Sequence, residues 1–155
     1  MTLLTRWGAA LDPEAVLPEY PRPQLVRDSY LNLNGRWRYA VSPVEPEALD
    51  GYDGYDGYDG YDGYDGYDGD IVVPFSPEAP LSGVGRQLLP GQTLWYRRAL
   101  TLPDGFAVPG GRVLLHFGAV DQTCRVLLNG VEVGTHIGGY LPFACDITDT
   151  LREGP

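Results

Sequence analysis

The feature that most constrains the fold is a series of short strand-like segments separated by tight turns. Its clearest part is a pair of segments, Thr123–Leu128 and Val131–His136, which are joined by Asn129-Gly130. Asn-Gly is the strongest two-residue hairpin signal because both residues tolerate the positive φ of a type I′ turn. Apolar residues recur at every second position in both segments, as in a half-buried strand. This part of the chain is therefore predicted to form an antiparallel hairpin.

Similar segments occur along most of the remaining chain. They are Tyr30–Val41, which alternates after the Asn34-Gly35 turn, Asp70–Val73, Thr93–Leu102, Arg112–Phe117 and Tyr140–Ile147. The 21 glycines and 14 prolines favour turns, and no segment has the period of a long amphipathic helix. Short strands joined by turns predict an all-β fold, an antiparallel β-sandwich or jelly roll.

Six consecutive copies of Gly-Tyr-Asp, from Gly51 to Asp68, interrupt this pattern. Glycine at every third position disfavours both helix and strand because of its backbone entropy. Residues 50–70 are therefore predicted to form a flexible, low-complexity surface loop. Two alternative interpretations are a calcium site built from the aspartates and a sugar-stacking surface built from the tyrosines. The uniform repeat lacks the mixed ligands of a calcium loop, so the flexible loop is the preferred interpretation.

The repeat region also accounts for most of the net charge of −10. Eight of the 21 acidic residues lie between Asp50 and Asp70, which leaves 13 acidic residues against 11 basic ones and a net charge of about −2. A nearly neutral surface argues against a nucleic-acid partner, because such partners are held by clustered positive charge.

The ends of the chain predict its organisation and its compartment. The proline-rich residues 1–27 are typical of an extended arm, and residues 28–155 are predicted to be the sandwich domain. No apolar run is long enough for a signal peptide or a membrane span, so we expect a cytoplasmic protein with no membrane partner. In that compartment Cys124 and Cys145 are expected to be buried free thiols, although a disulfide remains open because it depends on geometry.

The sequence contains no motif that is typical of a catalytic or metal site. His116 and His136 have no second histidine or cysteine at ligand spacing, so no zinc site is predicted. Neither a Gly-x-Ser-x-Gly elbow nor a phosphate-binding loop occurs. Outside the repeat, Asp121, Glu132 and Asp146 lie on separate segments, and no pattern pairs two carboxyl groups. We therefore predict no catalytic residue, no metal and no cofactor in this chain.

A set of motifs follows in a fixed order between Tyr20 and Gly154. They are Tyr20–Leu25, Leu31–Trp37, Val72–Phe75 with Pro77-Glu78 and Leu81–Gly83, Leu94–Arg98, His116–Asp121, Leu128–Gly134, His136–Phe143 and Asp146–Thr148. This ordered set resembles the N-terminal sugar-binding domain of glycoside hydrolase family 2, the group of β-galactosidases, β-glucuronidases and β-mannosidases. The resemblance implies a galactose-binding-like jelly roll, in agreement with the strand pattern.

The resemblance also implies a function, that of the non-catalytic N-terminal domain of a retaining β-glycosidase acting on β-galactosides or related β-glycosides. The two catalytic glutamates of this family lie on a (β/α)₈ barrel further along the chain. No residue here matches them, so the barrel and the carbohydrate substrate would be the partners of this domain. The loop Pro74–Gly83 matches a loop that helps to form the pocket rim, which makes Ser76 and Glu78 the candidate rim residues.

Two departures from the family pattern lead to further expectations. The repeat stands where a short connection between strands is expected. The chain also stops at Pro155, before the last strands of the family sandwich, so we expect a truncated domain whose open edge is a place for homo-oligomers to form. The alternative function is a stand-alone carbohydrate-binding module without catalysis, and a calcium-responsive loop is a third.

Overall fold

A computed structural model describes residues 3–19, 22–42 and 67–152. The described residues form two compact units, one that runs to Ala99 and one that begins at Leu100. Most of the Gly-Tyr-Asp repeat lies outside the described residues, so its predicted flexibility stays a prediction.

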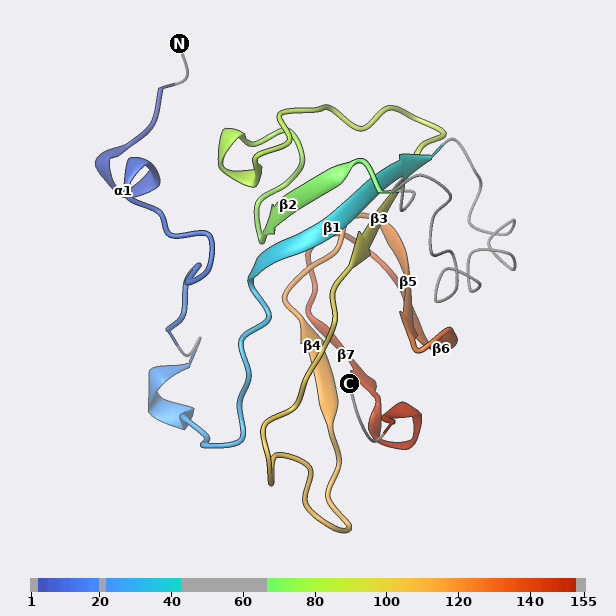
Figure 1. Cartoon of the computed structure of the whole chain (residues 1–155). Coiled ribbons are helices and arrows are strands. Elements are labelled where there is room, and N and C mark those ends of the chain that lie inside the picture. The colour runs from blue at the N-terminus through green and yellow to red at the C-terminus, as the bar shows by residue number, and fades with distance from the viewer. Residues whose placement is uncertain (1–2, 20–21, 43–66, 153–155) are drawn as a thin grey trace, which may run out of the picture. The chain divides into compact units, whose positions relative to one another are not determined.

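The strand that follows Asn34 is the centre of the sheet in the first unit. This strand, β1 (Gly35–Ser42), pairs antiparallel with β2 (Gly69–Val73) on one side and with β3 (Thr93–Arg97) on the other (Figure 1). Trp37 lies opposite Ile71, which is 0% exposed. β1 lies within the predicted strand-like segment except for Ser42, but its burial does not alternate as predicted, because Ala40 is 7% exposed while Val41 is half-buried. β3 ends five residues before the predicted Leu102.

The segment before β1 is bonded to that strand near its middle, where the Arg36 side chain donates a 2.5 Å hydrogen bond to Glu14. It contains two short helices, α1 (Arg6–Ala9) and the 3-10 helix η1 (Pro23–Leu25). Val16 is only 2% exposed, and the Asn32 side chain donates a 2.8 Å hydrogen bond to the carbonyl of Leu17. The extent of the arm, predicted as residues 1–27, and the domain boundaries at 28 and 155 stay predictions.

Two antiparallel strand pairs form the second unit. β4 (Leu114–Phe117) pairs with β7 (Phe143–Asp146), β5 (Thr123–Leu128) pairs with β6 (Val131–Ile137), and the 3-10 helix η5 (Thr148–Thr150) follows. In the turn between β5 and β6, Asn129 has a φ of 53° and Gly130 a φ of 78°. Positive φ at both positions confirms the predicted type I′ hairpin.

The two strand pairs of the second unit bury their side chains in one core. Its buried members are Val113, Val126, Cys145 and Ile147. Gly134 on β6 faces Cys145 on β7, because a Cβ atom on Gly134 would lie 2.5 Å from the Cys145 sulfur. The predicted all-β class with antiparallel sheets is therefore confirmed. With an α-helix of only four residues, the described part of the chain has no helix suited to crossing a bilayer.

Candidate functional site

The candidate rim residues lie in the loop that follows β2. The N–H of Ala79 donates to the carbonyl of Ser76 (2.9 Å), and the 3-10 helix η4 (Pro80–Ser82) then ends at Gly83, which has a left-handed φ of 81°. Ser82 is 0% exposed, and its hydroxyl donates to the carbonyl of Ala79 over 2.7 Å. A buried, hydrogen-bonded serine holds this proline-rich loop in one conformation, because its hydroxyl would be left unsatisfied in any other.

The structure brings Ser76 and Glu78 together. Both residues are exposed, and the Glu78 carboxylate accepts hydrogen bonds from its own backbone N–H, from the Ser76 hydroxyl and from the N–H of Leu88. These bonds favour the charged form and lower the pKa of Glu78 from its ordinary value. Glu78 is therefore ionised at neutral pH, so it can accept hydrogen bonds from hydroxyl groups but is unsuited to act as a general acid.

Tyr96 on β3 is a third member of this group. Its side chain is 41% exposed. Burial of its hydroxyl, and secondly the nearby charge of Glu78, raise the pKa of Tyr96. Its ring meets Trp37 edge-on, with the ring centroids 6.5 Å apart. Strand periodicity predicts which residues share a face with Tyr96 but not that the loop after β2 approaches it. We call Ser76, Glu78 and Tyr96 the rim cluster.

A second polar and aromatic group lies in the second unit, where the β4–β5 and β6–β7 loops meet. The N–H of Gly138 donates to the carbonyl of Gln122 over 2.7 Å. The Asp121 carboxylate lies against Gly139 so closely that a Cβ atom there would overlap it. The next residue, Tyr140, is 95% exposed. A carboxylate can accept hydrogen bonds from sugar hydroxyls, and an exposed ring can stack on the apolar face of a sugar.

The other acidic residues of the second unit have separate partners. The Glu132 carboxylate pairs with Arg125 at 2.7 Å. Asp146 pairs with Arg112 and also accepts hydrogen bonds from the hydroxyl (2.6 Å) and the N–H (3.0 Å) of Thr148. The structure thus gives Glu132 and Asp146 structural roles and does not pair them with each other.

Asp146 should make the second unit sensitive to acid. Hydrogen bonds from the hydroxyl and the N–H of Thr148, followed by those from Arg112, lower the pKa of Asp146 to about 2. Because the pKa is lower in the folded than in the unfolded chain, the stabilisation is complete above about pH 4 and is lost as the pH falls towards 2. Asp146→Asn should remove this part of the pH dependence in thermal unfolding between pH 2 and pH 5, and Thr148→Ala should remove some of it. An unchanged pH dependence in Asp146→Asn would contradict this assignment.

The two histidines lie in different surroundings. His116 on β4 is exposed, whereas the His136 ring stacks on Phe143 at 4.2 Å, and Phe143 stacks on Phe117 at 4.7 Å. Within the described ranges no group of three or more His, Cys, Asp or Glu residues could hold a metal ion. His136 is therefore placed as part of the packed interior of the second unit.

The two thiols lie in the same interior. Both are free, with Cys145 buried and Cys124 half-buried. Burial raises the pKa of each thiol, so both are protonated at neutral pH and behave as small apolar side chains.

Comparison with known proteins shows that part of this chain is similar to a known family. Residues 86–155 match the family described as glycosyl hydrolases family 2, sugar binding domain. The β-glucuronidase of Canis lupus familiaris is 43% identical over 63 residues, which are 40% of this chain and 10% of that protein. The β-galactosidase of Thermoanaerobacter pseudethanolicus is 38% identical over 60 residues, which are 39% of this chain and 8% of that protein.

A solved structure agrees with the sequence comparisons. The β-glucuronidase of Faecalibacterium prausnitzii matches with a TM-score of 0.52 and 30% identity, over 81% of this chain and 19% of that one. The matched segments amount to about a tenth of the length of these curated relatives. The resemblance that the ordered motifs predicted is confirmed: residues 86–155 are similar to the sugar-binding domain of glycosyl hydrolases family 2, and the similar proteins are β-glucuronidases and a β-galactosidase.

Proposed function

We propose that this chain is the N-terminal, non-catalytic part of a β-glycosidase that hydrolyses β-glucuronides, β-galactosides or related β-glycosides. The observation that carries the proposal is the match of residues 86–155 to the family 2 sugar-binding domain. The similar curated proteins are β-glucuronidases and a β-galactosidase, and the matched segments are only about a tenth of each.

The proposed partner is the catalytic (β/α)₈ barrel of the same protein. Retaining hydrolysis needs an acid and a nucleophile about 5 Å apart, and the acid needs a raised pKa. The pKa shift of Glu78 is in the opposite direction, and Glu132 and Asp146 are occupied by separate ion pairs. In this proposal the barrel supplies the reacting carboxyl groups, and this chain supplies part of the pocket rim.

Within this function the rim cluster is the surface that faces the substrate. The ionised Glu78 carboxylate is an acceptor for sugar hydroxyls, and Ser76 orients it through a hydrogen bond. Tyr96, 41% exposed, offers an aromatic surface and a hydroxyl beside this carboxylate. A loop held by the buried Ser82 can present these groups without first becoming ordered, which lowers the entropic cost of binding.

A second candidate function is a stand-alone carbohydrate-binding module. The observation in its favour is Tyr140, which is 95% exposed and directly follows Gly139, the residue against which the Asp121 carboxylate lies. This pair would bind sugar by stacking and by hydrogen bonds, without a barrel. The two functions therefore place the sugar in different units of the chain.

Sugar titration should distinguish the two functions. With isotope-labelled chain and methyl β-glucuronide or methyl β-galactoside, we expect weak binding, at about millimolar concentration, that shifts the amide signals of Ser76, Glu78 and Tyr96. Glu78→Gln should weaken this binding, because a neutral amide is a poorer acceptor than a carboxylate. The matched control Glu132→Gln, which removes a charge in the second unit, should leave the binding unchanged.

Three other outcomes would count against the proposal. Shifts confined to the loops around Asp121 and Tyr140 would favour the stand-alone module. The absence of any shift at about 50 mM sugar would remove both candidates, because that concentration far exceeds a millimolar Kd. Release of nitrophenol from chromogenic β-glycosides by the isolated chain would contradict a non-catalytic role.

A further inference from the structure

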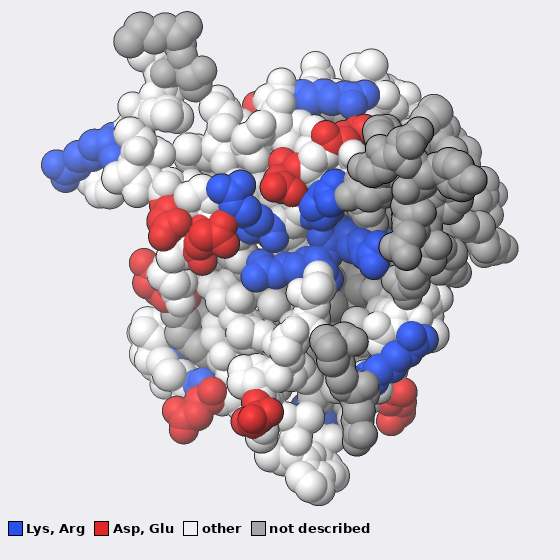
Figure 2. Space-filling view, in the orientation of Figure 1, with Lys and Arg blue, Asp and Glu red and all other residues white. Residues whose placement is uncertain are grey.

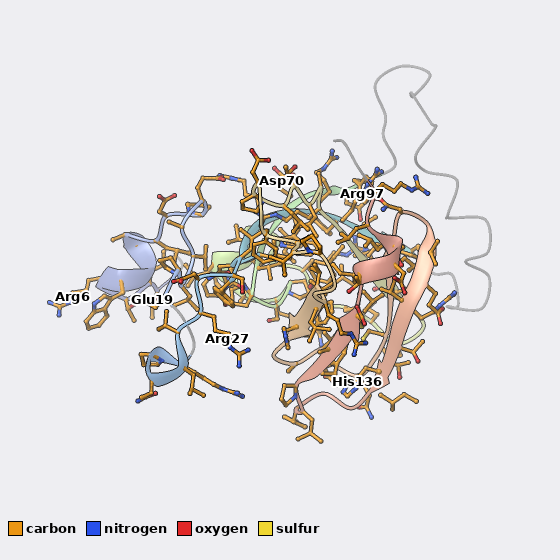
Figure 3. All side chains as sticks on the ribbon, turned by 90° about the horizontal axis from the view of Figure 1, so that it is seen from below. Arg6, Glu19, Arg27, Asp70, Arg97 and His136 are labelled. Atoms are coloured by element: carbon orange, nitrogen blue, oxygen red, sulfur yellow. The ribbon has the colours of Figure 1, made fainter. Side chains whose placement is uncertain are left out.

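The two cysteines of the second unit lie on strands that both contact β6. Cys124 on β5 is paired with His136 on β6, so the two side chains point to the same side of this strand pair. Gly134 lies two residues before His136 and faces that side too, where it meets the sulfur of Cys145 on β7. The ring of His136, which Figure 3 labels, stacks on Phe143 of the same strand β7. β7 therefore covers the side of β5 and β6 to which Cys124 points.

The two sulfur atoms are drawn together over β6. A Cβ atom on Gly134 would lie 2.5 Å from the Cys145 sulfur, so the missing side chain leaves room for that sulfur directly over the strand. The N–H of His136 donates a hydrogen bond to the Cys124 sulfur, which holds this sulfur against β6 as well. Burial raises the pKa of Cys124, and the charge of the Cys145 thiol raises it further, an effect of groups a few ångströms apart. The two thiols are thus neighbours in the interior of the unit.

We propose that Cys124 and Cys145 form a reversible intramolecular disulfide, a modification site in the core of the second unit. The oxidant is a low-molecular-weight disulfide, such as glutathione disulfide. One sulfur–sulfur bond forms between the two protein sulfurs, and the sulfur–sulfur bond of the oxidant breaks. The protein gives up two electrons and two protons, and the oxidant takes them up as two molecules of free thiol.

The burial of the two thiols sets the order of the two exchange steps. Cys124 is half-buried and Cys145 is buried, so the oxidant reaches Cys124 first. The attacking species is the thiolate, which the hydrogen bond from the His136 N–H favours at the Cys124 sulfur. Its attack gives a mixed disulfide on Cys124 and releases the first free thiol. The Cys145 thiolate then attacks the Cys124 sulfur and displaces the second free thiol.

Proximity drives this reaction, because no cation activates the thiols. On the face seen in Figure 2, arginine side chains lie next to acidic side chains. The second unit has two such ion pairs, Arg112 with Asp146 and Arg125 with Glu132. Among the described residues, no basic side chain lowers the pKa of either thiol. The first step is therefore slow, whereas the second is fast because it takes place within one molecule at a high effective concentration.

The disulfide would tie β5 to β7. It closes a ring of residues 124–145, which contains the whole β6 strand and the exposed Tyr140. A cross-link that closes a ring of this size restricts mainly the unfolded chain and so stabilises the folded one. Oxidation should therefore raise the Tm of the second unit by about 5 °C or more.

The test uses the full chain, which has no cysteines besides these two. The reduced chain is incubated with excess glutathione disulfide at about pH 8.5, where a larger fraction of each thiol is deprotonated. Free thiols, intact mass and Tm are then measured. We expect both thiols to disappear, the mass to fall by that of two hydrogen atoms, and the Tm to rise. Dithiothreitol should restore both thiols and the original Tm.

Two single variants serve as matched controls, each with one thiol left. In Cys145→Ala the reaction should stop at one bound glutathione on Cys124, with no rise in Tm, because the second attack is missing. In Cys124→Ala the remaining buried thiol should react about tenfold or more slowly than Cys124 does in Cys145→Ala. The measurements on the natural chain are decisive even if a variant fails to fold. Two bound glutathiones, two surviving thiols or a disulfide-linked dimer in the natural chain would overturn the proposal.

Discussion

Replacing Ile147 by alanine should lower the free energy of unfolding of the second unit by about 2–5 kcal/mol, the range for truncating a large buried aliphatic side chain. Ile147 is 1% exposed and packs in the cluster with Val113, Val126 and Cys145. Its N–H also donates to the carbonyl of Val113 over 3.0 Å, so its backbone is held in place and cannot readily move into the cavity. Urea unfolding followed by circular dichroism measures the loss.

The matched control for this prediction is Leu114→Ala. Leu114 adjoins Val113 in the chain and has a side chain of the same volume class, but it is 46% exposed. Its truncation removes little buried area and should cost less than about 1 kcal/mol. If Ile147→Ala were as mild as Leu114→Ala, the core of the second unit would not be centred where the structure places it.

The strands were predictable from the sequence because local chemistry decides them. Asn129-Gly130 sets the turn type and the register next to the turn, and both residues have the required positive φ. Further from the turn, the register shifts between Val126 and Leu127. The strand ends were less predictable. β3 stops at Arg97, and the next residue, Arg98, donates hydrogen bonds to the carbonyls of Leu33 and Asn34. The alternation of apolar and polar residues cannot predict hydrogen bonds to residues so distant in the sequence, and so it cannot predict where the strand ends.

The short helix α1 was missed for a similar reason. The sequence predicts an extended arm over residues 1–27, and within it the structure has a turn opened by Asp12, whose side chain accepts from the N–H of Glu14 over 2.9 Å. The helix begins earlier, after Thr5, whose hydroxyl accepts from the N–H of Gly8 over 3.1 Å. A four-residue helix has too few residues for a period to show, so only its threonine cap signals it.

The candidate site was predictable in part. The family motifs single out Ser76 and Glu78, and the structure shows that they are hydrogen-bonded to each other. The sequence does not indicate that Tyr96 lies near these two residues, because its approach to Glu78 depends on how the loop after β2 folds back. The contact between Asp121 and Gly139 could not be predicted from the sequence either, because the two residues lie in loops that are separated by the β5–β6 hairpin.

Replacing Gly134 by alanine should destabilise the second unit by about 1–3 kcal/mol, the usual cost of overpacking a core. The added Cβ atom would lie 2.5 Å from the Cys145 sulfur, which is too close for any van der Waals contact. Gly134 lies in β6 and has no positive φ, so its backbone suits alanine and only the packing opposes the change. Gly118→Ala is the matched control, because a Cβ atom there meets nothing within 4 Å.

The same contact should make Gly134→Ala and Cys145→Ala compensate each other. Cys145→Ala alone removes one buried sulfur atom and should cost about 1 kcal/mol, as for a methylene group. In the double variant the new methyl group of residue 134 fills the space that the sulfur leaves, so the total cost should fall below the sum of the two single costs by at least about 0.5 kcal/mol. If the two losses of unfolding free energy were strictly additive, β6 and β7 would not pack through Gly134 and Cys145. The two strand pairs of the second unit would then not share one core.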